Sequence, residues 1–228
     1  MSLLMVLVYP EILPMTEEEC ISFPALGEPA PDFEAETTQG PIKLSELQGK
    51  WVVLFSHPAD FTPVCTTEFM AFAGINDELT ALNVKLVGLS VDSISAHLAW
   101  VRNIKEKMGV TIPFPVIADL NMKVAKKYGM IQPALNSTAA VRSVFFIDDK
   151  GILRAMIYYP MSSGRFMPEI IRLVKSLQTT DKYKVSTPAN WQPGDMVVVP
   201  APKTAAEMEK RLSEGYDCKD WYLCYKKV

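Results

Sequence analysis

The sequence has little cysteine, no excess of charge of either sign, and no long apolar run. Its 228 residues include four cysteines, too few and too widely spaced for the disulfide framework of a small secreted domain. The 23 basic and 26 acidic residues give a net charge of -3, without the basic excess of a nucleic-acid binder. No stretch approaches the roughly 18 apolar residues of a membrane span. We expect neither a nucleic-acid nor a membrane partner, and we expect cysteines that serve chemistry.

The first segment, residues 1–26, is expected to be an extension outside the main domain. Its opening, MSLLMVLVYPEILPM, is apolar, but it lacks a basic start and is interrupted by Pro10, Glu11 and Pro14. These features argue against a signal peptide and favour a cytoplasmic extension, for which a short strand is one form, with a cryptic targeting segment as the alternative. In the reducing cytoplasm a disulfide is more often catalytic than structural.

Strand and helix patterns alternate over residues 27–178. Apolar, β-branched runs indicate buried strands, and apolar residues at helical spacing indicate amphipathic helices. The expected strands are Trp51–Ser56, Val84–Val91, Phe114–Ala118, Ser143–Ile147 and Ile152–Tyr158. The expected helices are Cys65–Leu82, Ser93–Met108, Met122–Tyr128 and Met167–Leu177. Parallel strands joined by helices, with a hairpin at one edge, predict an α/β domain with a thioredoxin-like fold.

The remainder, residues 179–228, is expected to form a C-terminal arm. Four prolines keep residues 179–203 extended, and a short strand is expected at Met196–Val199. A small helix at Ala205–Ser213 then leads into the last stretch, GYDCKDWYLCYKKV.

Cys65 lies where the loop after the strand Trp51–Ser56 becomes a helix. Unpaired backbone N–H groups and the helix dipole stabilise a thiolate at such a position. Pro63 suits the first helical turn because its missing N–H is no loss there. The Thr62 hydroxyl lies three residues before the sulfur. A buried structural cysteine is the alternative, but the polar loop favours a reactive thiol.

The segment Pro58–Cys65, PADFTPVC, has the pattern P-x-x-x-T-x-x-C and resembles the active-site motif of the peroxiredoxins. The longer string SHPADFTPVCTTEF is similar to their one-cysteine branch, which includes archaeal and bacterial thioredoxin peroxidases. The resemblance covers roughly residues 27–228, arm included. It implies a thiol peroxidase that reduces hydrogen peroxide and organic hydroperoxides, with no cofactor and no metal.

The resemblance also assigns roles to residues. Cys65 attacks the terminal peroxide oxygen and becomes a sulfenic acid. Thr62 hydrogen-bonds the peroxide, and Pro58 shields the sulfur from bulk water. Arg142, at the start of RSVFFID, supplies the arginine that the family needs, and its fixed charge favours the thiolate and stabilises the departing oxygen. An ordinary surface arginine at a strand end is the alternative for Arg142.

Three further residues are candidates for substrate binding. Arg165, in YYPMSSGRF, matches a second arginine near the pocket, and a solvated arginine at a helix start is its alternative. Glu68 follows Cys65 by about one helical turn and can orient one of the arginines. His57 directly precedes Pro58 and matches the branch, although a single histidine is more often packed or hydrogen-bonded than a base.

The two cysteines of the arm, Cys218 and Cys224, are separated by five residues with no histidine nearby, unlike a zinc site. The aromatic residues between and beside them indicate a tail that docks onto a surface, or a purely structural anchor. By resemblance to archaeal-type members, Cys224 resolves the sulfenic acid of a partner subunit through a Cys65–Cys224 disulfide. Cys218 is then the secondary partner that exchanges the disulfide, and Cys20 takes no part.

The resemblance also implies partners. A thioredoxin-like dithiol recycles the enzyme, and subunits form dimers through their arms, often assembled into a decamer of five dimers. Some relatives carry a phospholipase activity on a G-x-S-x-G segment. The corresponding stretch here reads SELQGKW, so that activity is not expected.

Three other functions compete with a peroxidase. A thioredoxin-like disulfide reductase needs C-x-x-C at the helix start, whereas this chain reads CTTE from Cys65. A Cys–His hydrolase would need His57 as its base. In a chaperone or redox sensor the oxidised Cys65 is only a signal, and sustained turnover of peroxide distinguishes an enzyme from it.

Overall fold

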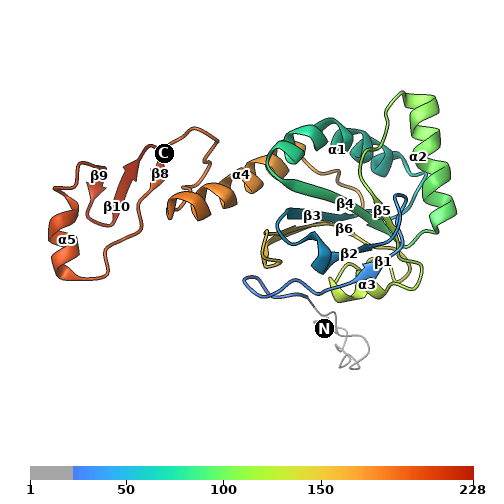
Figure 1. Ribbon diagram of the computed structural model, residues 1–228, viewed down its shortest axis with the longest axis horizontal. Helices are drawn as coiled ribbons and strands as arrows, with labels where there is room; N and C mark the ends of the chain where they lie inside the picture. Colours follow the sequence, from blue (N-terminus) through green and yellow to red (C-terminus); the bar gives the residue numbers. More distant parts are fainter. Residues whose placement is uncertain (1–22) are drawn as a thin grey trace, which may run out of the picture.

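A five-stranded mixed sheet forms the centre of the computed structural model, which describes residues 23–228 (Figure 1). The strands lie in the order β5-β4-β3-β6-β7, in which β3, β4 and β5 are parallel and β6 and β7 antiparallel to their neighbours. Their bounds are Trp51–Ser56 for β3, Val84–Ser90 for β4, Val116–Ala118 for β5, Arg142–Ile147 for β6 and Leu153–Tyr159 for β7. The predicted α/β architecture with a hairpin at one edge is confirmed.

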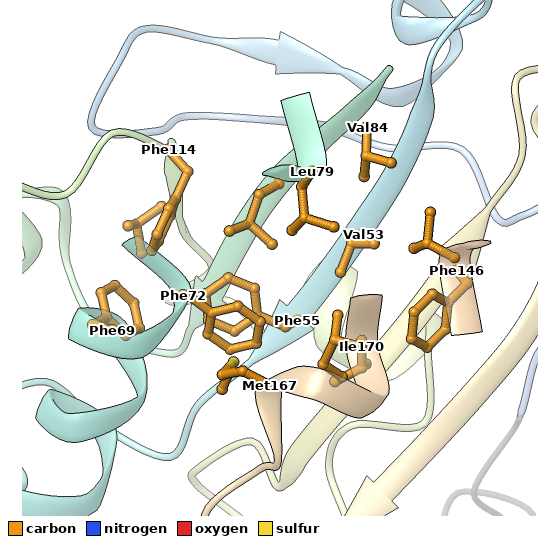
Figure 2. Packing of buried hydrophobic residues seen from close by; sticks show 14 of the residues in the cluster. Val53, Phe55, Phe69, Phe72, Leu79, Val84, Phe114, Phe146, Met167 and Ile170 are labelled. Atoms are coloured by element: carbon orange, nitrogen blue, oxygen red, sulfur yellow. The ribbon is translucent and has the colours of Figure 1, made fainter. Parts of the chain in front are cut away.

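Helices cover one face of this sheet, and alternate residues of the strands point to opposite faces. The helices are α1 (Pro63–Ala81), α2 (Ile94–Met108) and α4 (Met167–Tyr183). Figure 2 shows Val53 and Phe55 of β3 on this side, packed with residues of α1 and α4 such as Phe72 and Ile170. This cluster also contains Cys65, so the start of α1 is anchored in the core.

The opposite face of the sheet packs against shorter elements. These are β1 (Glu34–Ala35), β2 (Ile42–Lys43), the 3-10 helix η2 (Leu44–Leu47) and α3 (Lys123–Lys127). Val52 and Leu54, the alternate residues of β3, belong to the second buried cluster, which includes Val124 and Ala125 of α3. Because both faces are covered, all six residues of β3 are buried.

Two predicted boundaries differ from the structure, and the second bears on the domain organisation. Strand β5 begins at Val116 instead of Phe114, since the intervening proline has no N–H for a ladder hydrogen bond. Helix α4 runs to Tyr183, so the expected boundary between residues 178 and 179 falls inside it. The added turn is held by Asp181, which accepts two hydrogen bonds, of 2.6 and 2.8 Å, from Arg154 of β7.

The arm contains a small sheet, in which the strand predicted at Met196–Val199 is confirmed and the other two strands were not predicted. Its strands β8 (Val197–Val198), β9 (Asp217–Asp220) and β10 (Leu223–Lys226) lie in the order β8-β10-β9, and α5 (Ala205–Arg211) precedes β9. Figure 1 shows this sheet beyond the end of α4, away from the central sheet. Cys218 and Cys224 occupy paired positions on β9 and β10 and form a disulfide.

Residues 1–22 lie outside the part of the chain that the structure describes. They include Cys20 and most of the expected N-terminal extension. Over residues 23–228, no helix is both long and apolar enough to cross a membrane.

Candidate active site

The reactive cysteine candidate lies in the first turn of α1, which begins at Pro63 as the proline pattern favours. Cys65 is fully buried and forms no disulfide. Thr62 is the N-cap residue, and its hydroxyl donates a 2.9 Å hydrogen bond to the carbonyl oxygen of Ala59. The hydroxyl hydrogen is therefore occupied, and the lone pairs of the Thr62 oxygen are the atoms that it offers to a substrate O–H.

Arg142, the first residue of β6, reaches the sulfur directly. Its Nη1 lies 3.3 Å from Cys65 Sγ and 2.6 Å from Glu68 Oε2, and its Nε donates to the carbonyl oxygen of Met161 at 3.0 Å. The side chain is 3% exposed, so the alternative of a surface arginine at a strand end is wrong. The geometry places a permanent positive charge within hydrogen-bonding distance of the thiol.

Arg165 is the second buried arginine of the site, and the alternative of a solvated side chain is wrong for it as well. Its backbone N and its Nε donate to Glu68 Oε1 at 2.9 and 2.8 Å, and its Nη2 donates to Glu68 Oε2 at 2.6 Å. The guanidinium also lies over the rings of Phe55 and Phe72, each 5.1 Å away. Glu68 therefore holds both arginines, not only one of them.

The same guanidinium ties together the ends of two central strands. The regular pairing of β3 with β6 ends at Phe55 and Val144. Beyond that pair, Arg165 Nη1 donates to the carbonyl oxygens of Ser56 at 2.9 Å and Ser143 at 3.1 Å. The two serine hydroxyls lie 2.7 Å apart at the same point. A side chain thus joins the strands where the loop to Cys65 leaves the sheet.

The charges of this cluster do not balance without the sulfur. Burial alone would raise the pKa of Glu68, but hydrogen bonds and charge from Arg165, together with the charge of Arg142, hold that pKa below its usual value. One carboxylate then faces two guanidinium groups, which leaves one positive charge uncompensated in a buried site. One negative charge at the position of the Cys65 sulfur would balance the set.

His57 belongs to a separate buried network, with two residues that the sequence reading did not single out. Its Nε2 lies 2.9 Å from Asp60 Oδ1, and His97 Nδ1 of α2 lies 2.7 Å from Asp60 Oδ2. These three ligand-type atoms lie within 4.8 Å of one another. His57 Nε2 and His97 Nδ1 each face one carboxylate oxygen of Asp60, so hydrogen bonding accounts for this contact without a metal ion. Asp60 could have been singled out from the sequence, because it lies within the motif loop Pro58–Cys65.

Pro58 and the arm cysteines complete the set of predicted residues. Pro58 is buried beside His57 in the loop between β3 and α1. Cys224 is fully buried and Cys218 is partly exposed, and the two are bonded to each other within one chain. The structure thus brings together Cys65, Arg142, Glu68 and Arg165 as one cluster and places the arm cysteines in another part of the fold.

Comparisons with known proteins agree with this geometry. The model of the AhpC/TSA family matches residues 26–156, and that of the C-terminal domain of 1-Cys peroxiredoxin matches residues 176–215. A peroxiredoxin 2 of Caldanaerobacter subterraneus is 61% identical over 91% of this chain and 95% of its own length. A peroxiredoxin of Aquifex aeolicus is 60% identical over 92% of this chain and 100% of its own.

Solved structures give the same result. A yeast mitochondrial 1-Cys peroxiredoxin superposes with a TM-score of 0.80 at 40% identity, covering 90% of this chain and 100% of the other. The peroxiredoxin 6 of Arenicola marina gives the same TM-score and identity over 89% and 97% of the two chains. With the thioredoxin-like fold and the arginine-bound thiol in the first turn of α1, these matches show that the chain belongs to the AhpC/TSA family of peroxiredoxins and is a peroxidase.

Proposed function

We propose that the chain reduces hydrogen peroxide and small organic hydroperoxides through a sulfenic acid on Cys65. The observation that carries this proposal is the buried cluster of two arginines and one glutamate, whose single excess positive charge lies 3.3 Å from the sulfur. A thiolate is the form of cysteine that attacks peroxides. Burial keeps water from screening the arginine charge.

In the proposed reaction Cys65 releases its thiol proton to solvent, and solvent returns one proton to the leaving oxygen. The Cys65 thiolate attacks the terminal oxygen of ROOH, the S–O bond forms, and the O–O bond breaks. The sulfur is oxidised to Cys65–SOH, and the leaving RO⁻ takes up a proton to become an alcohol, or water when R is hydrogen. Arg142 stabilises the negative charge as it moves from sulfur to the leaving oxygen. Thr62 accepts a hydrogen bond from the peroxide, and His57 and Arg165 complete the substrate site.

The second half of the proposed cycle uses the arm. The Cys224 thiol of another subunit attacks Cys65–SOH, which forms a Cys65–Cys224 disulfide and releases water. Cys218 then displaces Cys65, and a thioredoxin-like dithiol reduces the resulting Cys218–Cys224 disulfide. Two observations support this order: the arm sheet lies away from the central sheet (Figure 1), and Cys218 and Cys224 are paired while Cys65 is free.

This cycle requires at least a dimer. We propose a homo-oligomer joined through the arms, with a decamer of five dimers as the full assembly, working in the cytoplasm where a dithiol reductant is supplied. Sedimentation of the reduced protein gives the subunit number. A monomer would remove the resolving step, since Cys224 could not then come from a partner.

Intact mass after one equivalent of peroxide tests the first half of the cycle. Reduced wild type is expected to gain one oxygen atom or to lose two hydrogens in a disulfide, whereas Cys65→Ser shows neither change. Equal masses before and after treatment in wild type would refute the proposal. Continued consumption of peroxide in the presence of a dithiol distinguishes an enzyme from a redox sensor, which is oxidised only once.

Non-reducing electrophoresis tests the second half. Reduced wild type treated with peroxide is expected to pass through a disulfide-linked dimer that disappears as Cys218 displaces Cys65, and Cys224→Ser cannot form this dimer. The matched variant Cys218→Ser keeps Cys224 and is expected to trap the dimer, because the displacing thiol is gone. A dimer in Cys224→Ser would show that Cys224 is not the resolving residue.

A further inference from the structure

The chain has two histidines, and both contact the same buried carboxylate. His57 follows β3, Asp60 lies in the motif loop, and His97 comes from the first turn of α2. His57 and His97 are fully buried and Asp60 is 8% exposed. The peroxidase chemistry proposed above has no step for His97 or Asp60. Their arrangement nevertheless fixes where the protons lie.

Both ring nitrogens of His97 face oxygen acceptors. Nδ1 lies 2.7 Å from Asp60 Oδ2, and Nε2 lies 3.0 Å from the carbonyl oxygen of Ile117. A carbonyl oxygen only accepts, so His97 Nε2 carries a hydrogen. A second proton then lies between His97 Nδ1 and Asp60 Oδ2, whichever of the two atoms holds it. Asp60 Oδ1 is left as an acceptor in both cases.

This requirement determines the form of His57. Because Asp60 Oδ1 accepts, His57 Nε2, 2.9 Å away, carries the hydrogen of that bond. Burial lowers the pKa of His57, although the hydrogen bond and charge of Asp60 oppose the shift, so the ring has one hydrogen only. Within residues 23–228, His57 Nδ1 is buried with no hydrogen-bond partner. An unpartnered lone pair is more readily tolerated there than a buried N–H without an acceptor.

We propose that His97 is a positioning residue that acts through Asp60 to hold His57 in the tautomer with hydrogen on Nε2 and a bare lone pair on Nδ1. The network reaches further, because the backbone N–H of Asp60 donates to Asp92 Oδ2 at 3.0 Å and Ser90 Oγ donates to the same oxygen at 2.6 Å. These bonds connect the motif loop to the end of β4 and to the turn before α2.

The consequence for the reaction rests on the proposed function. His57 lies between Ser56, whose carbonyl oxygen binds Arg165, and Pro58 of the motif. A bare Nδ1 can accept a hydrogen bond from an O–H group in this loop, such as that of a hydroperoxide or of the alcohol product. The other tautomer would present a donor instead. His97, on α2, therefore determines whether Nδ1 of His57, in the motif loop, accepts or donates a hydrogen bond.

Two-bond ¹H–¹⁵N spectra of protein labelled with ¹⁵N-histidine test the tautomer directly. With two rings in the chain, wild type is expected to show His57 with one protonated and one bare nitrogen, the bare one being Nδ1, and the variant His97→Asn assigns the signals. A His57 ring protonated on Nδ1, or on both nitrogens at pH 7, would overturn the proposal.

A pair of variants of similar volume tests the role of His97. Asn can place its amide N–H₂ where Nδ1 donates to Asp60, whereas Leu cannot donate. We expect His97→Leu to mix the two tautomers of His57 and to slow oxidation of Cys65 by hydrogen peroxide about tenfold, within the range for residues that orient a site residue. His97→Asn is expected to retain the tautomer and most of the rate. Equal spectra and rates in the two variants would overturn the positioning role.

A control separates this effect from a loss of packing. Ile104, one of the buried residues of α2, belongs to the apolar cluster and contacts neither histidine by hydrogen bond. Ile104→Val is expected to lower the melting temperature while leaving the His57 spectrum unchanged, and a shifted His57 signal there would contradict the assignment. If wild type shows the expected tautomer but no oxidation by peroxide, the proposed function fails and the tautomer inference stands.

Discussion

Replacing Arg142 by methionine is the sharpest test of how the site ionises its sulfur. The change removes one guanidinium and keeps a side chain of similar length. Glu68 and Arg165 then remain as a neutral buried pair, joined by hydrogen bonds of 2.6 and 2.8 Å between their side chains. A neutral thiol suits that pair, and a thiolate beside it becomes an unpaired buried charge.

The magnitude follows from the distance between Arg142 Nη1 and Cys65 Sγ, 3.3 Å. With an effective dielectric constant of about 20, two unit charges at that separation attract by about 5 kcal/mol, which is an upper limit for the loss. Removal of one donor from a preorganised anion site typically slows catalysis about 100- to 1000-fold. We therefore expect the second-order rate constant of Cys65 with hydrogen peroxide to fall by about that factor.

Stopped-flow measurement of a single oxidation gives this rate constant without the resolving step. The matched control is Arg154→Met, in which another partly buried arginine loses its ion pairs with Asp148 and Asp181 far from the sulfur. Arg154→Met is expected to lose stability but to keep the rate. A rate within threefold of wild type for Arg142→Met, with intact circular dichroism, would refute the charge argument.

Three further predictions concern stability. Glu68→Gln leaves two buried guanidinium groups without a carboxylate and is expected to lower the free energy of unfolding by about 3–5 kcal/mol. The control Glu78→Gln, at a half-exposed surface pair, is expected to change it by less than about 1 kcal/mol. Equal losses of the two variants in urea titrations would contradict this prediction. Because burial lowers the pKa of His57 below its usual 6.5, the unfolded chain binds a proton that the folded chain excludes, so stability is full above about pH 6.5 and falls below it. The slope approaches about 1.4 kcal/mol per pH unit, and the same slope in His57→Gln would rule out this origin. Reduction of the Cys218–Cys224 disulfide removes a cross-link worth about 2 kcal/mol from the arm hairpin. Hydrogen exchange of the Val199 amide, which donates to the Cys224 carbonyl at 2.9 Å, is expected to accelerate about 30-fold, and unchanged exchange would show that the sheet does not need the bond.

The central sheet was predictable because buried strands carry a strong local pattern. WVVLF in β3 and VFFI in β6 are apolar on both faces, as is typical of strands covered on both sides. The start of α1 was predictable for a different reason, since Pro63 and the motif loop mark a helix beginning. The arm hairpin was missed because β9 reads DCKD, an exposed polar strand without that signal.

The burial of the charged side chains was not predictable from the sequence. Arg165 follows SSG in a loop, and local pattern cannot distinguish a solvated guanidinium from one that is buried under two aromatic rings. His97 lies within the helix predicted at Ser93–Met108. Its link to Asp60 depends on how α2 packs beside the motif loop, 37 residues away in sequence. Local sequence pattern does not predict such contacts, because they form only when distant segments pack together.

The buried charge cluster joins residues that are far apart in the sequence, and this has a consequence during synthesis of the chain. Cys65 and Glu68 leave the ribosome long before Arg142 and Arg165, which are 77 and 97 residues further along from these two partners. A nascent chain that ends before Arg165 therefore has its cysteine but lacks at least one of the two positive charges of the buried cluster. If Cys65 is the reactive thiol proposed above, we expect it to gain its full reactivity toward peroxide only when nearly the whole domain has been made and closed.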